Sequence, residues 1–187
     1  KKDVLKSLKK EMKEFAKKLE TFSNRMYKDI RVGDARYYPF IPDKSIDGII
    51  TSPPYVNALD YNRIHQYNMA ILGYDYKHFA KEEIGAHGHY INNRWRLFSE
   101  YLADMFHAIN EMNRVTKKTG IICIVIGDSC LEYERIKSHK YFQQMAECMG
   151  MTHLLTLERS IDTASKYTNK IVGNIFNEHL IFLRPTN

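Results

Sequence analysis

The sequence predicts an α/β fold in which a mainly parallel sheet is flanked by helices, and three observations carry this prediction. Helical and strand patterns alternate along the chain in the order helix, strand, strand, helix, strand, helix, strand, strand. Residues 121–126 form a short, β-branched apolar run, which is typical of a strand buried on both faces. Polar residues and prolines follow the predicted strands at the ends where such sheets bind ligands.

The first 28 residues predict one amphipathic, basic helix. Apolar residues recur at alternating spacings of three and four from Leu5 to Met26, so they form one stripe. Residues 1–20 hold eight lysines and four acids, a net charge of +4. The charged side is either a solvated helix face or a surface that contacts phosphates.

The remaining residues, 29–187, predict five strands. Residues 29–34 indicate a short strand that ends at a turn, and residues 46–51 indicate a second strand. Pro53 and Pro54 halt the second strand because proline cannot donate to a ladder. The other strands are expected at residues 121–126, 152–158 and 179–183.

Two further helices are clear from apolar spacing. One covers residues 98–115 and is expected to be closed by Gly120, and the other covers 140–149 and is ended by Gly150. The polar, aromatic-rich segment between residues 56 and 98 is expected to contain one or two more helices. Its aromatic side chains either stack on bases or belong to the core.

Composition narrows the class of protein. With 187 residues, 44% hydrophobic and 27% charged, the chain is expected to form one globular domain over residues 1–187. The net charge of +6 is compatible with a polyanionic partner. No run approaches the roughly 20 apolar residues of a membrane span, and no signal peptide is visible, so no membrane partner is expected.

Cysteine and histidine usage argues against a metal. The three cysteines contain no CxxC pair, which excludes a disulfide framework and a structural zinc site and fits a reducing cytoplasm. His87 and His89 lie in a glycine-rich loop without a third ligand nearby in the sequence. We therefore expect no metal site.

The most informative motif follows the strand at residues 46–51. Two consecutive prolines remove two N–H donors and produce a rigid turn that presents carbonyl oxygens. Tyr55 places an aromatic face beside them, so the turn suits a planar base with an exocyclic amino group. The ring would stack on the base, while the Pro53 carbonyl and the Ser52 side chain would accept the amino hydrogens. The alternative is a strand-stopping turn with a core tyrosine.

Residues 47–55, Asp-Gly-Ile-Ile-Thr-Ser-Pro-Pro-Tyr, resemble the catalytic motif of the DNA amino-methyltransferases. These enzymes move a methyl group from S-adenosylmethionine to cytosine N4 or adenine N6, and serine before the prolines is typical of the cytosine branch. The resemblance covers about residues 29–183. It implies a Rossmann-like class I methyltransferase sheet, DNA as partner and a place in a prokaryotic restriction-modification system.

The resemblance also implies site residues. The catalytic set is Ser52, Pro53, Pro54 and Tyr55. Residues 33–36 resemble the motif whose acid lies near the cofactor adenine, so the set expected to bind S-adenosylmethionine is Asp34, Ala35, Thr51 and Ser52. Residues 60–65 resemble the helix after the catalytic loop, and the set expected to contact DNA is Asp60, Tyr61, Arg63, His65, Arg94, Arg96 and Asp128. Asp128 either contacts substrate or caps the segment that follows it.

One part of the family pattern is missing. None of the nine glycines forms the Gly-x-Gly turn that holds the methionine end of the cofactor. The chain is therefore expected to hold the later strands of a partial sheet. The cofactor half would be a second polypeptide or a missing segment, before Lys1 or, in a permuted branch of the family, after Asn187. A partner would cover the exposed edge.

Two other functions stay open from the sequence. The first is methylation of an amino group in RNA or of a protein amide, because Pro-Pro-Tyr serves those substrates too, usually after Asn or Asp. The second is a non-catalytic subunit that binds DNA for a partner enzyme.

Overall fold

The computed structural model describes residues 4–22, 29–56, 60–86, 90, 92–160 and 177–186. The structure divides into two compact units, residues 1–33 and 34–187. Each unit is described by itself. In the described parts of both units, no helix combines the length and apolar character needed to cross a bilayer.

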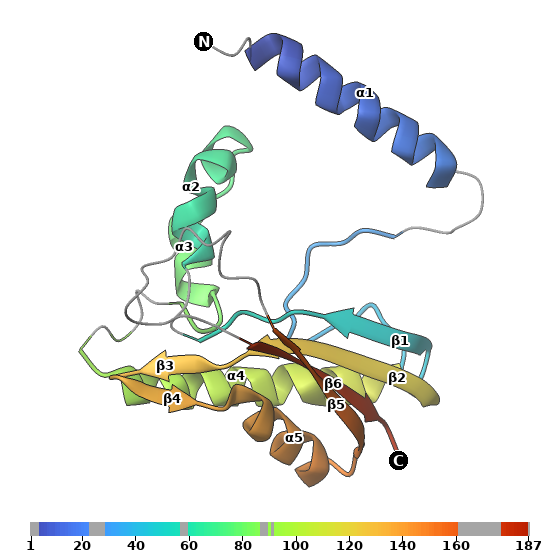
Figure 1. The fold of residues 1–187 in the computed structure, drawn as a ribbon, viewed down its shortest axis with the longest axis vertical. Helices are drawn as coiled ribbons and strands as arrows, with labels where there is room; N and C mark the ends of the chain where they lie inside the picture. Colours follow the sequence, from blue (N-terminus) through green and yellow to red (C-terminus); the bar gives the residue numbers. More distant parts are fainter. Residues whose placement is uncertain are drawn as a thin grey trace. The chain divides into compact units, whose positions relative to one another are not determined.

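The first unit contains one helix, α1 (Val4–Phe22), which confirms the helical pattern (Figure 1). Its apolar residues Met12 and Phe15 are exposed. Residues 29–33 form no strand, so the prediction of a strand at 29–34 was wrong. Ile30 and Val32 are 94% and 83% exposed.

The second unit is built on a four-stranded sheet in the order β1 (Ile46–Thr51), β2 (Thr116–Gly127), β6 (Asn177–Arg184) and β5 (Thr152–Ser160). β1 and β2 are parallel, whereas β6 is antiparallel to both β2 and β5. β1, β2 and β5 therefore run in one direction, as expected for a mainly parallel sheet, and β6 alone of these four strands is reversed. Parallel and antiparallel strands occur together in many α/β folds that carry a reversed strand near one edge.

Two helices, α4 (Arg94–Val115) and α5 (Ser138–Cys148), pack against one face of this sheet (Figure 1). The alternation of side chains along β2 and β6 directs every second residue into this layer. The core contains the fully buried residues Tyr101, Met105, Ile109, Ile122, Ile124, Ile126, Phe142, Ile181 and Leu183. The helices expected at 98–115 and 140–149 are thus confirmed.

The opposite face of the sheet carries exposed apolar residues. Ile50 pairs with Cys123, and Leu157 pairs with Leu180, so these side chains share the face away from α4 and α5. Ile50 is 85% and Leu157 54% exposed. The described residues of the second unit therefore cover one face of the sheet and leave an apolar one open.

Gly120 and Gly150 were both expected to end helices, but only Gly150 does so. Gly150 follows α5 with a φ of 74° and ends it, as expected. Gly120 does not close α4, which ends at Val115 and leads directly into β2. Gly120 lies within β2, where a Cβ atom would be 2.7 Å from the Asp47 carbonyl oxygen. Its role is to allow close approach of the two chain segments.

The remaining elements frame the edge where β1 and β2 end. α2 (Tyr61–Ile71) and α3 (Tyr76–Glu82) lie between residues 56 and 98, where one or two helices were expected. An unpredicted hairpin is formed by β3 (Ser129–Leu131) and β4 (Glu134–Ile136). Its turn residues Glu132 and Tyr133 have φ angles of 47° and 70°, which the sequence does not signal because neither is Gly, Asn or Asp.

Candidate active site

The Ser-Pro-Pro-Tyr turn lies at the carboxyl edge of the two parallel strands. Thr51, the last residue of β1, pairs with Ile124 of β2. Because parallel strands end on the same side, residues 52–55 and Asp128 leave the sheet at one edge. Ser52 is exposed, Pro53 is buried and Tyr55 is half-buried. The structure thus brings the predicted catalytic turn and Asp128 to the same side of the sheet.

The turn is held from behind by Tyr101 of α4. The Tyr101 hydroxyl donates a hydrogen bond to the Pro54 carbonyl oxygen at 2.9 Å. Tyr101 is fully buried, and burial raises its pKa, so the hydroxyl keeps its proton and remains a donor. The Pro54 carbonyl is therefore committed to an internal bond.

A glycine shapes the space around Tyr101. Gly85 has a φ of 70°, and a Cβ atom there would lie 2.8 Å from Cδ2 of the Tyr101 ring and 3.5 Å from the Cα of Val56. Gly85 therefore allows the backbone to pass against both Tyr101 and the end of the Ser-Pro-Pro-Tyr turn. A side chain at this position would displace one of them.

Tyr55 is fixed from the front by Glu178 of β6. Its hydroxyl donates to Glu178 Oε1 at 2.9 Å, and Glu178 also pairs with Arg159 of β5. Burial and the bond to this carboxylate raise the pKa of Tyr55 to about 12. The ring is thus held as a neutral phenol that links β1 to β6.

The burial of the Tyr55 hydroxyl and its bond to Glu178 predict a specific dependence on alkaline pH. The folded-state pKa of Tyr55 lies above its ordinary value of 10.0, so the contribution of the protonated hydroxyl to stability is complete below about pH 10 and is lost as the pH rises through about 12. A phenolate absorbance titration of wild type and Tyr55→Phe is expected to differ by one group that ionises near pH 12. A difference near pH 10 would contradict the burial of this hydroxyl together with its bond to Glu178.

Asp34 lies in a charged network instead of at a strand end. Arg36 Nε donates to Asp34 Oδ1 at 2.9 Å, and its other nitrogens bond Asp104 of α4 and Glu82 of α3. The guanidinium lowers the pKa of the Asp34 carboxyl. Arg36 and Tyr101 also line a cavity of about 400 Å³. Asp34 and its neighbour Ala35 thus belong to a turn that Arg36 ties to α3 and α4.

Asp60 precedes α2 but does not cap it. Its side chain makes no capping hydrogen bond, whereas Glu83 accepts from the backbone nitrogens of Tyr61 and Asn62 at 2.6 and 2.9 Å. The Asp60 carboxylate lies 3.7 Å from Arg63, whose side chain is exposed, as is that of His65. Glu83 therefore satisfies the first backbone N–H groups of α2.

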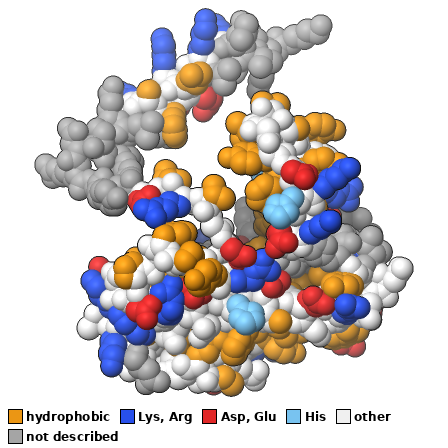
Figure 2. Space-filling view, turned by 180° about the vertical axis from the view of Figure 1, so that it is seen from behind, with side chains coloured by type: hydrophobic (Ala, Val, Ile, Leu, Met, Phe, Trp, Pro, Cys, Tyr) orange, Lys and Arg blue, Asp and Glu red, His pale blue; other side chains and the backbone are white. Residues whose placement is uncertain are grey.

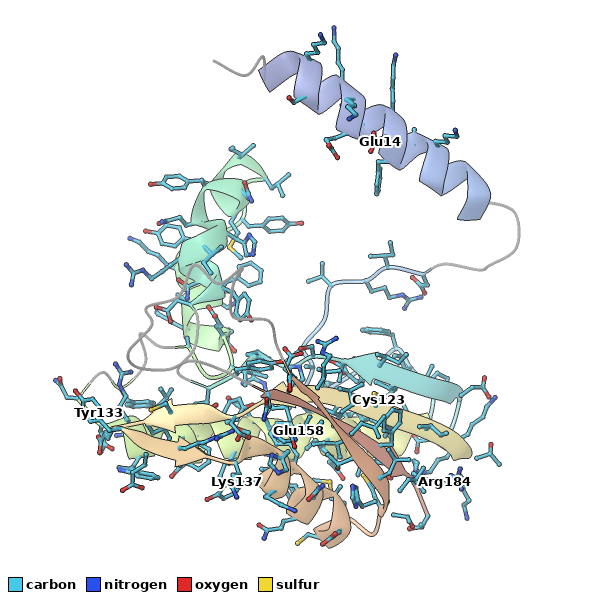
Figure 3. All side chains as sticks on the ribbon, in the orientation of Figure 1. Glu14, Cys123, Tyr133, Lys137, Glu158 and Arg184 are labelled. Carbon is cyan, nitrogen blue, oxygen red and sulfur yellow. The ribbon has the colours of Figure 1, made fainter. Side chains whose placement is uncertain are left out.

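The aromatic residues of α2, α3 and the segment after them are largely exposed. Figure 3 shows ring-bearing side chains that point away from α2 and α3, and Figure 2 shows hydrophobic side chains gathered over this pair. The exposed set includes Tyr61, Tyr67, Tyr74, Tyr76, Tyr90 and Trp95. The sequence left open whether these aromatic side chains stack on bases or belong to the core, and their exposure shows that they do not belong to the core.

The basic residues at the start of α4, which are expected to contact DNA, are partly engaged within the protein. Arg96 lies 4.3 Å from the centre of the Tyr90 ring and pairs with Glu100 at 3.4 Å. Arg94 is half-buried. His87 and His89 fall outside the described residues, and α1 belongs to the other unit, so neither is placed relative to the turn.

Asp128 is a buried carboxylate at the end of β2. It is 7% exposed and contacts Arg135, His139 and His179. It does not cap α5, whose N-terminal cap is Lys137. The contact with substrate expected from the sequence stays a prediction for this carboxylate.

Sequence reasoning found the turn but not its supports. Tyr101 lies in the helical apolar stripe of residues 98–115, which signals burial but not a hydrogen bond to residue 54. Glu178 lies directly before the strand expected at residues 179–183 and carries no separate signal. A buried tyrosine needs a partner for its hydroxyl, and this is the one signal that points toward Tyr101.

The class of protein to which the chain belongs follows from a match to a protein family. The family model described as DNA methylase, for N6 and N4 methyltransferases, matches residues 46–183, most of the chain. The chain therefore belongs to this family, and the expected Rossmann-like methyltransferase fold is confirmed.

Two curated relatives are type II methyltransferases. The chain is 29% identical over 100 residues to M.MjaII of Methanocaldococcus jannaschii, across 54% of the chain and 18% of that protein. It is 34% identical over 71 residues to M.BsoBI of Geobacillus stearothermophilus, across 38% of the chain and 14% of that protein. The chain thus spans less than a fifth of either relative.

Solved structures share the fold at low identity. A protein of Thermus thermophilus assigned as a DNA modification methylase, in complex with S-adenosyl-L-methionine, matches with a TM-score of 0.52 and 19% identity, over 83% of this chain and 54% of that one. The cytosine-N4-specific PvuII DNA methyltransferase matches with a TM-score of 0.51 and 14% identity, over 82% and 47%. The chain corresponds to about half of each.

Proposed function

We propose that this chain is the catalytic half of an S-adenosylmethionine-dependent DNA methyltransferase that methylates an exocyclic amino group, cytosine N4 in preference to adenine N6. The observation that carries the proposal is the Ser52–Tyr55 turn, held between Tyr101 and Glu178 at the carboxyl edge of β1. Family membership supports the reaction class. The serine before the prolines supports the cytosine branch.

The turn prepares the amino group of the target base. Because Tyr101 occupies the Pro54 carbonyl, the Pro53 carbonyl and the exposed Ser52 hydroxyl are the acceptors for the two amino hydrogens. Accepting both draws the nitrogen lone pair out of conjugation with the ring and makes the nitrogen more nucleophilic. The Tyr55 ring stacks on the base, which must leave the duplex to reach it.

The residues of this chain fit the cofactor in part. Thr51 and the exposed Ser52 at the end of β1, with Asp34 and Ala35, are the residues proposed to hold S-adenosylmethionine. When bound, it supplies the electrophilic methyl group. No glycine-rich turn is present for its amino-acid end. Transfer is therefore direct and depends on positioning by the two halves together.

A second polypeptide or adjoining segment completes the site. β1 is an edge strand, and Ile50 and Leu157 are exposed on the uncovered face of the sheet. An unpaired edge beside an apolar face marks a surface that a partner covers. The chain also spans about half of the solved structures that it resembles. We further propose a cytoplasmic location, which the three cysteine thiols support.

DNA is the proposed partner of the α2–α3 surface. Exposed rings such as Tyr67 and Tyr74 offer stacking faces, and Arg63 and His65 lie on the same helix, α2. The cationic side chains of α1 and the partly buried Arg94 are proposed to contact phosphates. This surface positions the duplex, whereas Tyr55 receives the base.

Nucleoside mass spectrometry tests the proposal. DNA and RNA would be taken from a methylation-free host that expresses the chain alone or with its neighbouring coding sequence. N4-methylcytosine in DNA is the expected product. If the enzyme is split, this product is expected only when the neighbouring coding sequence is expressed with the chain. N6-methyladenine would overturn the base preference, modified RNA alone would favour the RNA alternative, and no modified base would favour a DNA-binding subunit.

A further inference from the structure

Three polar side chains from three separate elements meet behind the catalytic edge. Asp128 follows the last residue of β2, His139 lies in the first turn of α5, and His179 lies in β6 opposite Ile126. Their exposed fractions are 7%, 8% and 7%. Buried polar groups normally satisfy one another completely, so such a cluster requires a reason for its geometry.

The ligand-type atoms of this cluster converge. Asp128 Oδ1 lies 3.2 Å from Nδ1 of His139 and 3.5 Å from Nε2 of His179, and all three atoms lie within 4.8 Å of one another. Nitrogen and oxygen ligands at bond lengths of 2.0–2.2 Å around a tetrahedral ion are separated by about 3.3–3.5 Å. The two distances to Asp128 therefore already match the spacing around one ion.

The cluster is incompletely satisfied without an additional group. His179 Nε2 is buried and makes no hydrogen bond within the part of the chain that the structure describes. The nitrogen lies 3.5 Å from Asp128 Oδ1, but the two atoms do not meet the geometry of a hydrogen bond. The ring of His179 stacks on that of His139 with centroids 3.7 Å apart, which holds both imidazoles in place. An electron-pair acceptor near Oδ1 would satisfy the orphan nitrogen.

Arg135 orients the carboxylate for such an acceptor. Its Nε donates to Asp128 Oδ2 at 2.9 Å, which leaves Oδ1 directed at the two histidines. A hydrogen bond to the second oxygen of a ligating carboxylate is the usual outer support of a metal site. Arg135 itself is largely exposed, so its charge is partly screened by solvent.

We propose that Asp128, His139 and His179 bind a divalent transition-metal ion of the zinc type. Two imidazoles and one carboxylate are the donor set of such ions, with a fourth position for water. The ion would join β2, α5 and β6 directly beneath the turn. Because Glu178, which holds Tyr55, is the neighbour of His179, the site would also stabilise the part of β6 that faces the turn.

Metal binding by the purified full chain tests this site. The protein would be stripped with a chelator, dialysed and titrated with Zn²⁺ against a chromophoric competitor. One ion per chain is expected, with a rise in the thermal midpoint. Asp128→Asn and His179→Gln are expected to weaken binding on the order of 100-fold or more. His107→Gln, which changes an exposed histidine of α4, serves as the matched control and is expected to bind like wild type.

A spectroscopic measurement on the wild-type chain covers the case in which the variants do not fold. Co²⁺ in a four-coordinate site gives intense visible absorption, whereas six-coordinate Co²⁺ on surface groups gives very weak bands. Intense bands that Zn²⁺ removes at one equivalent would support the site. Weak bands, binding below one ion per chain, or equal affinity in Asp128→Asn and wild type would overturn it. None of these readouts requires methyl transfer, so the result is independent of the proposed function.

Discussion

Replacing Tyr55 with alanine is expected to abolish methyl transfer while the fold persists. The variant removes the ring proposed to stack on the base and the bond to Glu178 that holds this ring in place. Loss of an oriented contact at the reacting centre reduces the rate on the order of 100-fold or more. Single-turnover transfer to an oligonucleotide, measured with the complete enzyme, gives the rate, and circular dichroism confirms the fold.

Two companion variants separate the ring from its environment. Tyr55→Phe keeps the stacking face and loses only the hydroxyl bond, so a smaller loss, about tenfold, is expected. Tyr133→Ala removes an exposed ring at the tip of the β3–β4 hairpin, labelled in Figure 3, and is expected to leave transfer unchanged. Transfer by Tyr55→Ala within a factor of two of wild type would rule out the stacking role.

The elements that were predicted correctly carry local signals. Strand β1 begins at Ile46 and ends at Thr51, as expected, because two prolines that cannot pair follow it. The run at 121–126 lies in β2, also as expected, because an unbroken β-branched apolar run is typical of a strand that is buried on both faces. These signals also placed residues 52–55 and Asp128 at the same edge of the sheet.

The failures depend on partners that are distant in the sequence. Residues 29–33 have strand composition, but a strand forms only beside another strand. Two hydrogen bonds hold the predicted catalytic turn. Tyr101 and Pro54 are separated by 47 positions in the sequence, and Tyr55 and Glu178 by 123. The cluster at Asp128 was missed similarly, because metal-type spacing was sought along the sequence rather than across three elements.

The largest expected effect on stability is that of Gly85→Ala, and the chain provides a matched comparison in Gly73→Ala. Both glycines have positive φ angles, 70° and 77°, so alanine at either position carries the left-handed backbone cost of roughly 1–2 kcal/mol. At Gly73 a new Cβ meets nothing within 4 Å, whereas at Gly85 it lies 2.8 Å from the Tyr101 ring. The difference between the two variants therefore isolates the contact with Tyr101.

Gly85→Ala is expected to lower the free energy of unfolding by about 1–3 kcal/mol more than Gly73→Ala, because the core must move to admit the methyl group. Urea denaturation of both variants measures this difference. If Tyr101 moves, its bond to the Pro54 carbonyl weakens, so Gly85→Ala and Tyr101→Phe should both slow transfer while Gly73→Ala does not. Equal losses of stability in the two glycine variants would mean that Gly85 serves only its backbone conformation and that the catalytic turn does not depend on the close packing behind it.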